Sequence, residues 1–475
     1  MNKVGKVNSL VYRISLIATL GGFLFGYDTA VISGAISSLD HFFVKPMMLS
    51  EIQSNALLCF IVSSALFGCI IGSLLSAFVS NKFGRKKGLL LSAFLFLVSA
   101  IGSSFPEIGF KALGSTGELV IVQFIVYRLI GGIGIGLASV MSPMYISEIA
   151  PSKIRGKLVS WNQLALVSGI LLVYFVNFII SLQGDVTWNI LWGWRWMFVS
   201  SAIPAALFFG TLWFVPESPR WLLLKGRETE AVSILSRITN KSEMQHELEE
   251  IRLLKSSQST VSRSLLSFGF LVLFIGMALS VFQQLVGIQV VMYYTPEIFK
   301  NLGTSSESAM FQTIMVGTVN FVFTIIAIKL VDKSGRKPLL IVGSFLMFLS
   351  MTVLGICFYV GYQGILSIVC VMGFVGSFAF SWGPVTWVLL SEIFPNAIRG
   401  KAMAIAVAVQ WISNYLVSLA FPLIDKSTYL VNHFHHAFSF WFFGAMAFLS
   451  FLFVWRFIPE TKEKSLEEIE KLWKK

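Results

Sequence analysis

The chain has 475 residues, of which 56% are hydrophobic and only 13% are charged, and its formal net charge is +12. A soluble chain normally carries roughly 25% charged residues, and it could not hide this much apolar surface in one or two ordinary cores. The composition excludes a soluble enzyme, a disordered protein and a secreted disulfide scaffold, and it favours a polytopic helical membrane protein.

Twelve apolar segments follow along the chain, and each is about as long as, or longer than, the roughly 20 residues that a membrane-spanning helix needs. Six are predicted in the first half, at 10–36, 54–80, 88–106, 118–147, 157–183 and 194–216. Six more are predicted in the second half, at 264–299, 309–331, 338–361, 363–391, 401–425 and 437–458. Between the two groups, residues 217–263 form a polar stretch that is typical of a water-exposed helix.

These segments predict an all-α membrane protein with twelve transmembrane helices. Its parts are a six-helix bundle over 1–216, a helical linker over 217–263, a second six-helix bundle over 264–458 and a tail over 459–475. Most of the 36 Lys and Arg residues lie in the two tails and in every second connection between spans, and so on one side of the membrane. An excess of Lys and Arg marks the cytoplasmic side. Both termini and the linker are therefore expected in the cytoplasm. Nucleic-acid binding is not expected, because no soluble domain collects the positive charge.

Short turns in the first half return in the second half. NKFGRKK at 81–87 returns as DKSGRKP at 332–338, SEIAPSKIRGK at 147–157 as SEIFPNAIRGK at 391–401, and PES at 216–218 as PET at 459–461. Three matched motifs in one order indicate two related halves. Because six spans return the chain to its starting side, the repeats are parallel, the arrangement of transporters whose site lies at the midplane between the halves.

The repeated turns place guanidinium groups beside carboxylates at the cytoplasmic ends of helices. We expect pairs of Arg85 and Arg336 with Glu148 and Glu392 to hold the inner face shut and to break when it opens. The alternative is that these charges only anchor helices at the membrane surface. The predicted gating residues are Gly84, Arg85, Glu148, Arg155, Gly335, Arg336, Glu392 and Arg399.

Several motifs resemble those of the sugar porter family of the major facilitator superfamily. They are the two turns above, YRLIGGIGIG at 127–136, PESPRWL at 216–222, FQQLVGI at 282–288, VTWVLLSEIFPNAIRG at 385–400 and PETK at 459–462. The resemblance runs from about residue 15 to the C-terminus, and its wording is most similar to the bacterial proton-coupled xylose carriers of the family. It implies a monomeric carrier in a bacterial inner membrane that moves a monosaccharide by alternating access.

Two ionisable residues stand out within predicted spans, where charges are costly and functional. Asp28 lies in the first span and Arg128 in the fourth. We expect contact between them to hold Asp28 ionised, and separation to favour proton uptake. The resemblance implies this proton-coupling role, and passive glucose carriers of the family lack the acid. The alternative is a static ion pair.

The other polar residues at mid-span are uncharged, which fits an uncharged sugar. The resemblance implies that the sugar site is lined by Gln163, Gln283, Gln284, Asn320, Trp387, Gln410 and Trp411, with Phe25 and Tyr293 nearby. Gln289 is added because it lies one helical turn before Tyr293. For any one amide the alternative is a hydrogen bond between helices. Breaks are expected at Gly287 and at Trp382-Gly383-Pro384, which would turn the flanking segments toward a cavity.

Two residues depart from the pattern of the xylose carriers. The family usually has Asn where this chain has Gln289, and the xylose carriers have Gln where it has Ile170. Losing a hydrogen-bonding group changes which hydroxyl is recognised. Xylose, another pentose, or a hexose such as glucose or galactose therefore all remain open.

The sequence thus predicts a secondary transporter that imports a monosaccharide with a proton. A proton-independent facilitator is the nearest alternative, and a non-transporting sugar sensor is disfavoured by the short tail over 460–475. No cofactor, metal site or catalytic group is expected. In particular, we interpret Gly131–Gly136 as a helix-packing segment rather than a nucleotide-binding loop, and we expect no metal at His433, His435 and His436.

Overall fold

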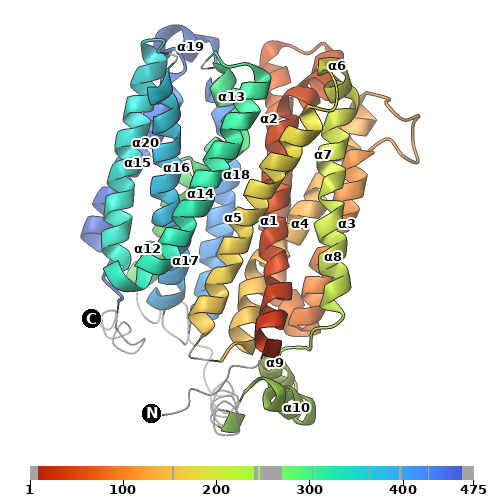
Figure 1. Ribbon diagram of the computed structural model, residues 1–475, viewed down its shortest axis with the longest axis vertical. Helices are drawn as coiled ribbons and strands as arrows, with labels where there is room; N and C mark the ends of the chain where they lie inside the picture. Colours follow the sequence, from red (N-terminus) through yellow and green to blue (C-terminus); the bar gives the residue numbers. More distant parts are fainter. Residues whose placement is uncertain are drawn as a thin grey trace.

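Long helices stand side by side in the computed structural model (Figure 1). The structure describes residues 9–151, 154–239, 244–245, 270–301, 303–362, 364–394, 398–425 and 427–462. In this part of the chain, twelve helical stretches are long and apolar enough to cross a membrane. The predicted number of spans and the all-α class are confirmed.

The first six spans form what we call the N-terminal half. Its helices are α1 (Ser9–Leu39), α2 (Glu51–Phe83), α3 (Arg85–Ser104), α4 (Glu118–Ile149), α5 (Arg155–Ser181), α6 (Val186–Trp188), α7 (Trp194–Ser200) and α8 (Ala202–Leu212). The first span is longer than predicted and reaches Met47, because a π-helical turn (Asp40–Val44) and a 3-10 turn (Lys45–Met47) continue α1. Phe42 and Phe43 of this extension are buried against Trp194, which explains why it stays helical.

The last six spans form the C-terminal half. Its helices are α12 (Phe270–Leu285), α13 (Ile288–Asn301), α14 (Ser306–Ser334), α15 (Arg336–Tyr359), α16 (Ile365–Phe380), α17 (Trp382–Ile393), α18 (Arg399–Asp425), α19 (Thr428–Phe434) and α20 (Ala437–Phe457). Both predicted breaks are present. Gly287 takes a φ of +90° between α12 and α13, a conformation that glycine adopts without strain. The other break lies at Ser381, between α16 and α17.

Small residues allow the helices to approach closely. α2 packs along α4, where a Cβ on Gly132 would overlap the carbonyl of Ala65, and one on Gly136 would overlap that of Cys69. The glycine-rich segment is therefore a packing face, as predicted. Large apolar side chains such as Phe214 and Ile203 are exposed on the outside of the bundle, as expected for surfaces that face lipid.

The two halves meet along the middle of the molecule. α18 packs on α2, and α14 packs on α5. Two short helices, α9 (Pro219–Leu224) and α10 (Glu228–Ile238), follow the N-terminal half and lie beyond the spans, at the end where α1 begins (Figure 1). Most of the remainder of the predicted linker, 240–243 and 246–263, lies outside the described residues.

Candidate functional site

A cavity lies between the two halves, in the middle of the spans. Its N-terminal wall comes from one face of α1 and one face of α5. Its C-terminal wall comes from α12, α13, α14, α16, α17 and α18. The residues that line it are Phe25, Gly26, Thr29, Gln163, Leu166, Val167, Ile170, Gln283, Gln284, Ile288, Gln289, Met292, Asn320, Thr324, Phe378, Ala379, Gly383, Trp387 and Gln410.

The structure brings most of the predicted sugar-binding residues to this one cavity. They are Phe25, Gln163, Gln283, Gln284, Gln289, Asn320, Trp387 and Gln410. The two helix breaks explain part of this convergence: α13 starts anew at Ile288, and α17 starts anew at Trp382, so both begin beside the cavity. Ile170 and Gln289, the two departures from the family pattern, also line it.

Three of the lining amides are buried and have an acceptor oxygen without a partner in the described structure. The Oε1 atoms of Gln283, Gln284 and Gln410 are all unpaired, although the amide nitrogen of Gln283 donates to the carbonyl of Trp382 at 3.0 Å. Buried polar atoms are nearly always hydrogen-bonded. A polar ligand with several hydroxyl donors would satisfy these oxygens, whereas an anion would be repelled by them.

Two predicted residues lie behind the cavity wall. Trp411 is 4% exposed, and its ring lies 5.3 Å from that of Phe25, which does line the cavity. Tyr293 is 2% exposed, one residue beyond Met292. Neither residue is part of the cavity lining, and Trp411 packs against Phe25 from behind. Asn177, which lies in α5 like Gln163, lines a separate small pocket nearer the end of that helix.

Asp28 and Arg128 form a buried ion pair. An Nη1–H of Arg128 donates to Oδ2 of Asp28 at 3.1 Å, and the two side chains are 2% and 3% exposed. The guanidinium also lies 5.2 Å from the centre of the Phe198 ring. Because Phe25, Gly26 and Thr29 of the same helix line the cavity, a shift of α1 would act on both sites.

The predicted gating residues form a cluster in the N-terminal half. Arg85 donates through Nη2 to Glu148 at 2.8 Å. Glu217 accepts hydrogen bonds from the backbone N–H groups of Arg85 and Lys86, at 2.9 and 3.1 Å. Gly84 has a φ of +94°, and a Cβ there would overlap the Glu217 carboxylate. The turn is thus closed by the carboxylate of the PES motif.

The C-terminal half repeats this arrangement. Arg336 donates through Nη2 to Glu392 at 3.0 Å, and Glu460 accepts from the backbone N–H groups of Arg336 and Lys337, at 3.1 and 3.0 Å. Gly335 has a φ of +86° and faces the Glu460 carboxylate. Each Arg–Glu pair lies within one half and does not bridge the two. The gating role therefore stays a prediction.

Arg155 and Arg399 complete the predicted gating set. Arg155 is the first residue of α5 and is exposed. The Arg399 side chain lies outside the described residues, although its backbone begins α18.

Sequence reasoning missed the roles of Glu217 and Glu460, although the PES and PET repeats marked their positions. Burial would raise the pKa of Glu460, but backbone N–H donors, led by those of Lys462, Arg336 and Lys337, outweigh it and hold this pKa below its ordinary value. The carboxylate therefore remains ionised at neutral pH and stabilises the turn.

A second buried ion pair was also missed. Arg195 of α7 is 1% exposed, with Nη2 lying 2.7 Å from Oε1 of Glu107, which is fully buried. Glu107 also accepts from the backbone N–H of Gly114 at 2.7 Å. The guanidinium is also enclosed by aromatic rings, including that of Trp194 at 4.4 Å.

Comparisons with known proteins bear on both the fold and the cavity. The family model described as "Sugar (and other) transporter" matches residues 14–473. The D-xylose-proton symporter of Escherichia coli K12 is 52% identical over 98% of this chain and 96% of its own. The glucose facilitated diffusion protein of Zymomonas mobilis is 41% identical, with 98% of each chain covered. A solved structure of the proton:xylose symporter bound to 6-bromo-6-deoxy-D-glucose superposes with a TM-score of 0.87, at 52% identity, over 98% of this chain and 99% of that one.

Proposed function

This chain belongs to the sugar transporter family, and from that premise we propose that it imports a monosaccharide together with a proton by alternating access. The observation that carries the proposal is a central cavity lined by unpaired amide oxygens, next to a buried Asp28–Arg128 pair on the helix that forms one wall. The cavity provides for a neutral, hydroxyl-rich ligand, and the ion pair provides for a proton. No catalytic step is proposed.

The cavity chemistry suits a sugar. Amides of Gln283, Gln284 and Gln410 can pair with several hydroxyls at once, and the ring of Trp387 offers an apolar surface to the face of a pyranose. A site that hydrogen-bonds each hydroxyl discriminates strongly against sugars that lack one. Ile170 supplies no hydrogen bond on the α5 wall, so pentoses and hexoses are both candidate substrates.

The ion pair supplies the coupling. While Arg128 contacts Asp28, the guanidinium compensates the charge of the buried carboxylate. When the two separate, burying the lone carboxylate becomes expensive, and binding a proton removes that cost. Because α1 carries both Asp28 and the cavity residue Phe25, proton binding and sugar binding would bias the same helix movement.

The two halves, 1–216 and 264–458, would move against each other around the cavity, in one chain that acts as a monomer. We place both termini and the linker over 217–263 in the cytoplasm of a bacterial inner membrane, because the basic residues gather on that side. The two Arg–Glu clusters would then lie at the cytoplasmic face, where they would brace each half while the inner mouth opens and closes.

The alternative is a proton-independent facilitator, and this alternative is supported by the relative described as a glucose facilitated diffusion protein. Uptake into proteoliposomes separates the two. D-xylose, L-arabinose, D-glucose and D-galactose are each tested with and without an inward proton gradient. We expect at least one sugar to accumulate above its external concentration only when the gradient is present.

Asp28→Asn serves as the matched variant. It should abolish accumulation driven by the gradient and retain exchange of sugar across the membrane, because the cavity amides are unchanged. Undiminished accumulation by this variant would refute the coupling assignment. Transport of a sugar without any response to the gradient would favour the facilitator.

A further inference from the structure

One backbone carbonyl beside the cavity has lost its helical partner. α13 contains Pro296 within the helix. Proline has no N–H, so the carbonyl four residues earlier receives no helical hydrogen bond. That carbonyl belongs to Met292, which is 3% exposed. A buried carbonyl without a donor is costly, and a donor must come from elsewhere.

The donor comes from the opposite half. The hydroxyl of Tyr174, in α5, donates to the Met292 carbonyl at 2.7 Å. Tyr174 is 2% exposed. Its ring also packs against α14, where a Cβ on Gly317 would lie 2.8 Å from the ring. The side chain is thus inserted from the N-terminal half between two helices of the C-terminal half.

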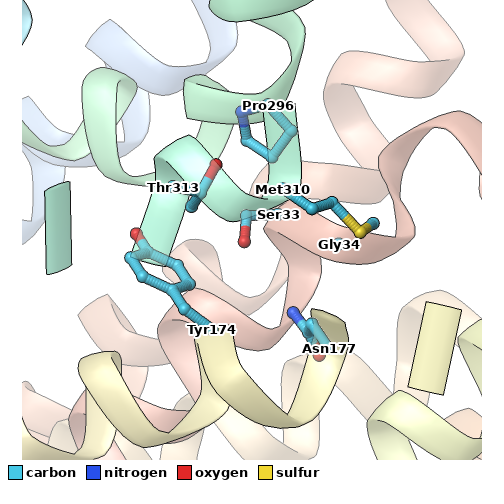
Figure 2. Close-up of a pocket in the computed structure, with 7 residues that line it drawn as sticks. All are labelled: Ser33, Gly34, Tyr174, Asn177, Pro296, Met310 and Thr313. Carbon is cyan, nitrogen blue, oxygen red and sulfur yellow. The ribbon is translucent and has the colours of Figure 1, made fainter. Parts of the chain in front are cut away.

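This contact lies at the end of the molecule away from α9 and α10. Figure 2 shows Tyr174 and Asn177 of α5 facing Pro296 and Thr313 across a small pocket. Further along the same interface, the rings of Phe178 and Phe311 lie 6.2 Å apart. The Tyr174 hydrogen bond and the contact between these two rings hold the two halves together at this end.

The same short helix also forms the sugar cavity. α13 follows Gly287, whose φ of +90° marks the break after α12. Gln289 and Met292 of its first turns line the cavity, while the Met292 carbonyl faces Tyr174. A movement of α13 about Gly287 would therefore change the sugar contacts and break the Tyr174 hydrogen bond together.

We propose that Tyr174 is a positioning residue of the transport cycle: its hydroxyl caps the carbonyl left bare by Pro296 and so holds α13 closed over the outer mouth of the cavity. This proposal rests on the alternating-access function above. Pro296 leaves the Met292 carbonyl without a helical donor. Because Tyr174 donates to this carbonyl from the other half, the hydrogen bond exists only while the two halves are closed at this end. Opening the outer mouth breaks a bond that no residue within α13 replaces.

The test is a double-mutant cycle on outer-mouth opening. Ser33 is 3% exposed and lines the pocket of Figure 2, so a Ser33→Cys reporter reacts with a membrane-impermeant maleimide, applied from outside, only when the mouth opens. Labelling rates are measured without sugar or proton gradient. We compare the reporter protein with its Tyr174→Phe, Pro296→Ala and doubly substituted forms.

Tyr174→Phe should raise the labelling rate about 5- to 30-fold, the factor that follows from a free-energy change the size of one hydrogen bond. In the Pro296→Ala background, an N–H at residue 296 satisfies the Met292 carbonyl, so the same substitution should change the rate less than about 2-fold. Equal effects in both backgrounds, or no effect in either, would overturn the proposal.

Tyr27→Phe is the matched control. It removes a tyrosine hydroxyl that lies 2.8 Å from Ser200 within the N-terminal half, so it should leave the labelling rate unchanged. A similar increase in this control would mean that general loosening causes the effect, and it would also overturn the proposal. Transport in proteoliposomes is a separate measurement: its failure would refute the proposed function without altering the labelling cycle.

Discussion

The N-terminal half buries charges where the C-terminal half buries amides. Asp28–Arg128 and Glu107–Arg195 are both almost fully enclosed among the N-terminal helices. In the described part of the C-terminal half, the Lys300–Glu297, Arg336–Glu392 and His436–Asp425 pairs lie near helix ends and are partly exposed. The polar side chains that face the cavity from this half are mostly amides such as Gln283. The buried charges thus belong to the N-terminal half, whereas most of the amides that face the cavity belong to the C-terminal half.

The largest effect should come from breaking the Asp28–Arg128 pair on one side. Arg128→Gln leaves a buried carboxylate without its partner, which typically costs about 3–5 kcal/mol. The double variant Asp28→Asn with Arg128→Gln removes both charges and should recover most of that loss. Thermal unfolding in detergent measures the stability, and proteoliposomes measure accumulation, which should be absent in both variants.

A cavity amide provides the contrast from the other half. Gln284→Leu should leave the unfolding temperature close to that of the unaltered protein, because no charge is stranded, yet it should weaken sugar uptake.

If the variant with both Asp28→Asn and Arg128→Gln were as unstable as Arg128→Gln alone, the ion pair would not act as a unit.

The second buried pair should matter for stability but not for coupling. Glu107→Gln strands the Arg195 guanidinium and should cost about 3 kcal/mol. The protein that remains folded should still accumulate sugar in response to a proton gradient, because Glu107 lies outside the cavity lining. Loss of the gradient response at normal sugar exchange would show that both N-terminal pairs belong to the proton pathway.

The two Arg–Glu clusters allow a direct comparison between the halves. Alanine at Gly84 or Gly335 must adopt the positive φ of the turn with an extended ψ, a conformation that is nearly confined to glycine and costs about 1–3 kcal/mol. It also adds a Cβ against a carboxylate. The overlap is closer at Gly84, and the Arg85–Glu148 pair there is more buried than Arg336–Glu392. Gly84→Ala should therefore lower the unfolding temperature more than Gly335→Ala. If Gly335→Ala lowered the unfolding temperature more than Gly84→Ala, the more exposed cluster would contribute more to stability.

The fold followed from the sequence because its signals are local. Apolar runs of one membrane thickness and turns repeated at one period need no knowledge of distant contacts. The adjacent residues Gln410 and Trp411 show where this reasoning ends. Gln410 lines the cavity, and Trp411 packs against Phe25 behind the wall. Successive residues differ by about 100° around a helix, and the sequence does not show which of the two faces the cavity.

Other features depend on partners far along the chain. Arg195 stands among tryptophans that are typical of a membrane surface, and only the fold brings Glu107 to it. The partner of Tyr174 is a backbone carbonyl, which leaves no mark on the sequence except the proline that exposes it. Such contacts come from the packing of the two halves, so a reading of one segment at a time misses them.

The smallest effect, and the finest test of the comparison, concerns pH at the C-terminal cluster. The pKa of Glu460 is lowered, because its backbone N–H donors outweigh the effect of burial. A carboxylate whose pKa falls on folding stabilises the native state above its unfolded value, about 4.3, and this contribution is lost as pH falls through the lower folded value. Hydrogen exchange at the amides of Arg336 and Lys337 should therefore become less protected at acidic pH, and Glu460→Gln should remove that dependence. If Glu460→Gln left the pH dependence of exchange unchanged, a group other than Glu460 would cause it. The pH dependence would then not distinguish the two clusters.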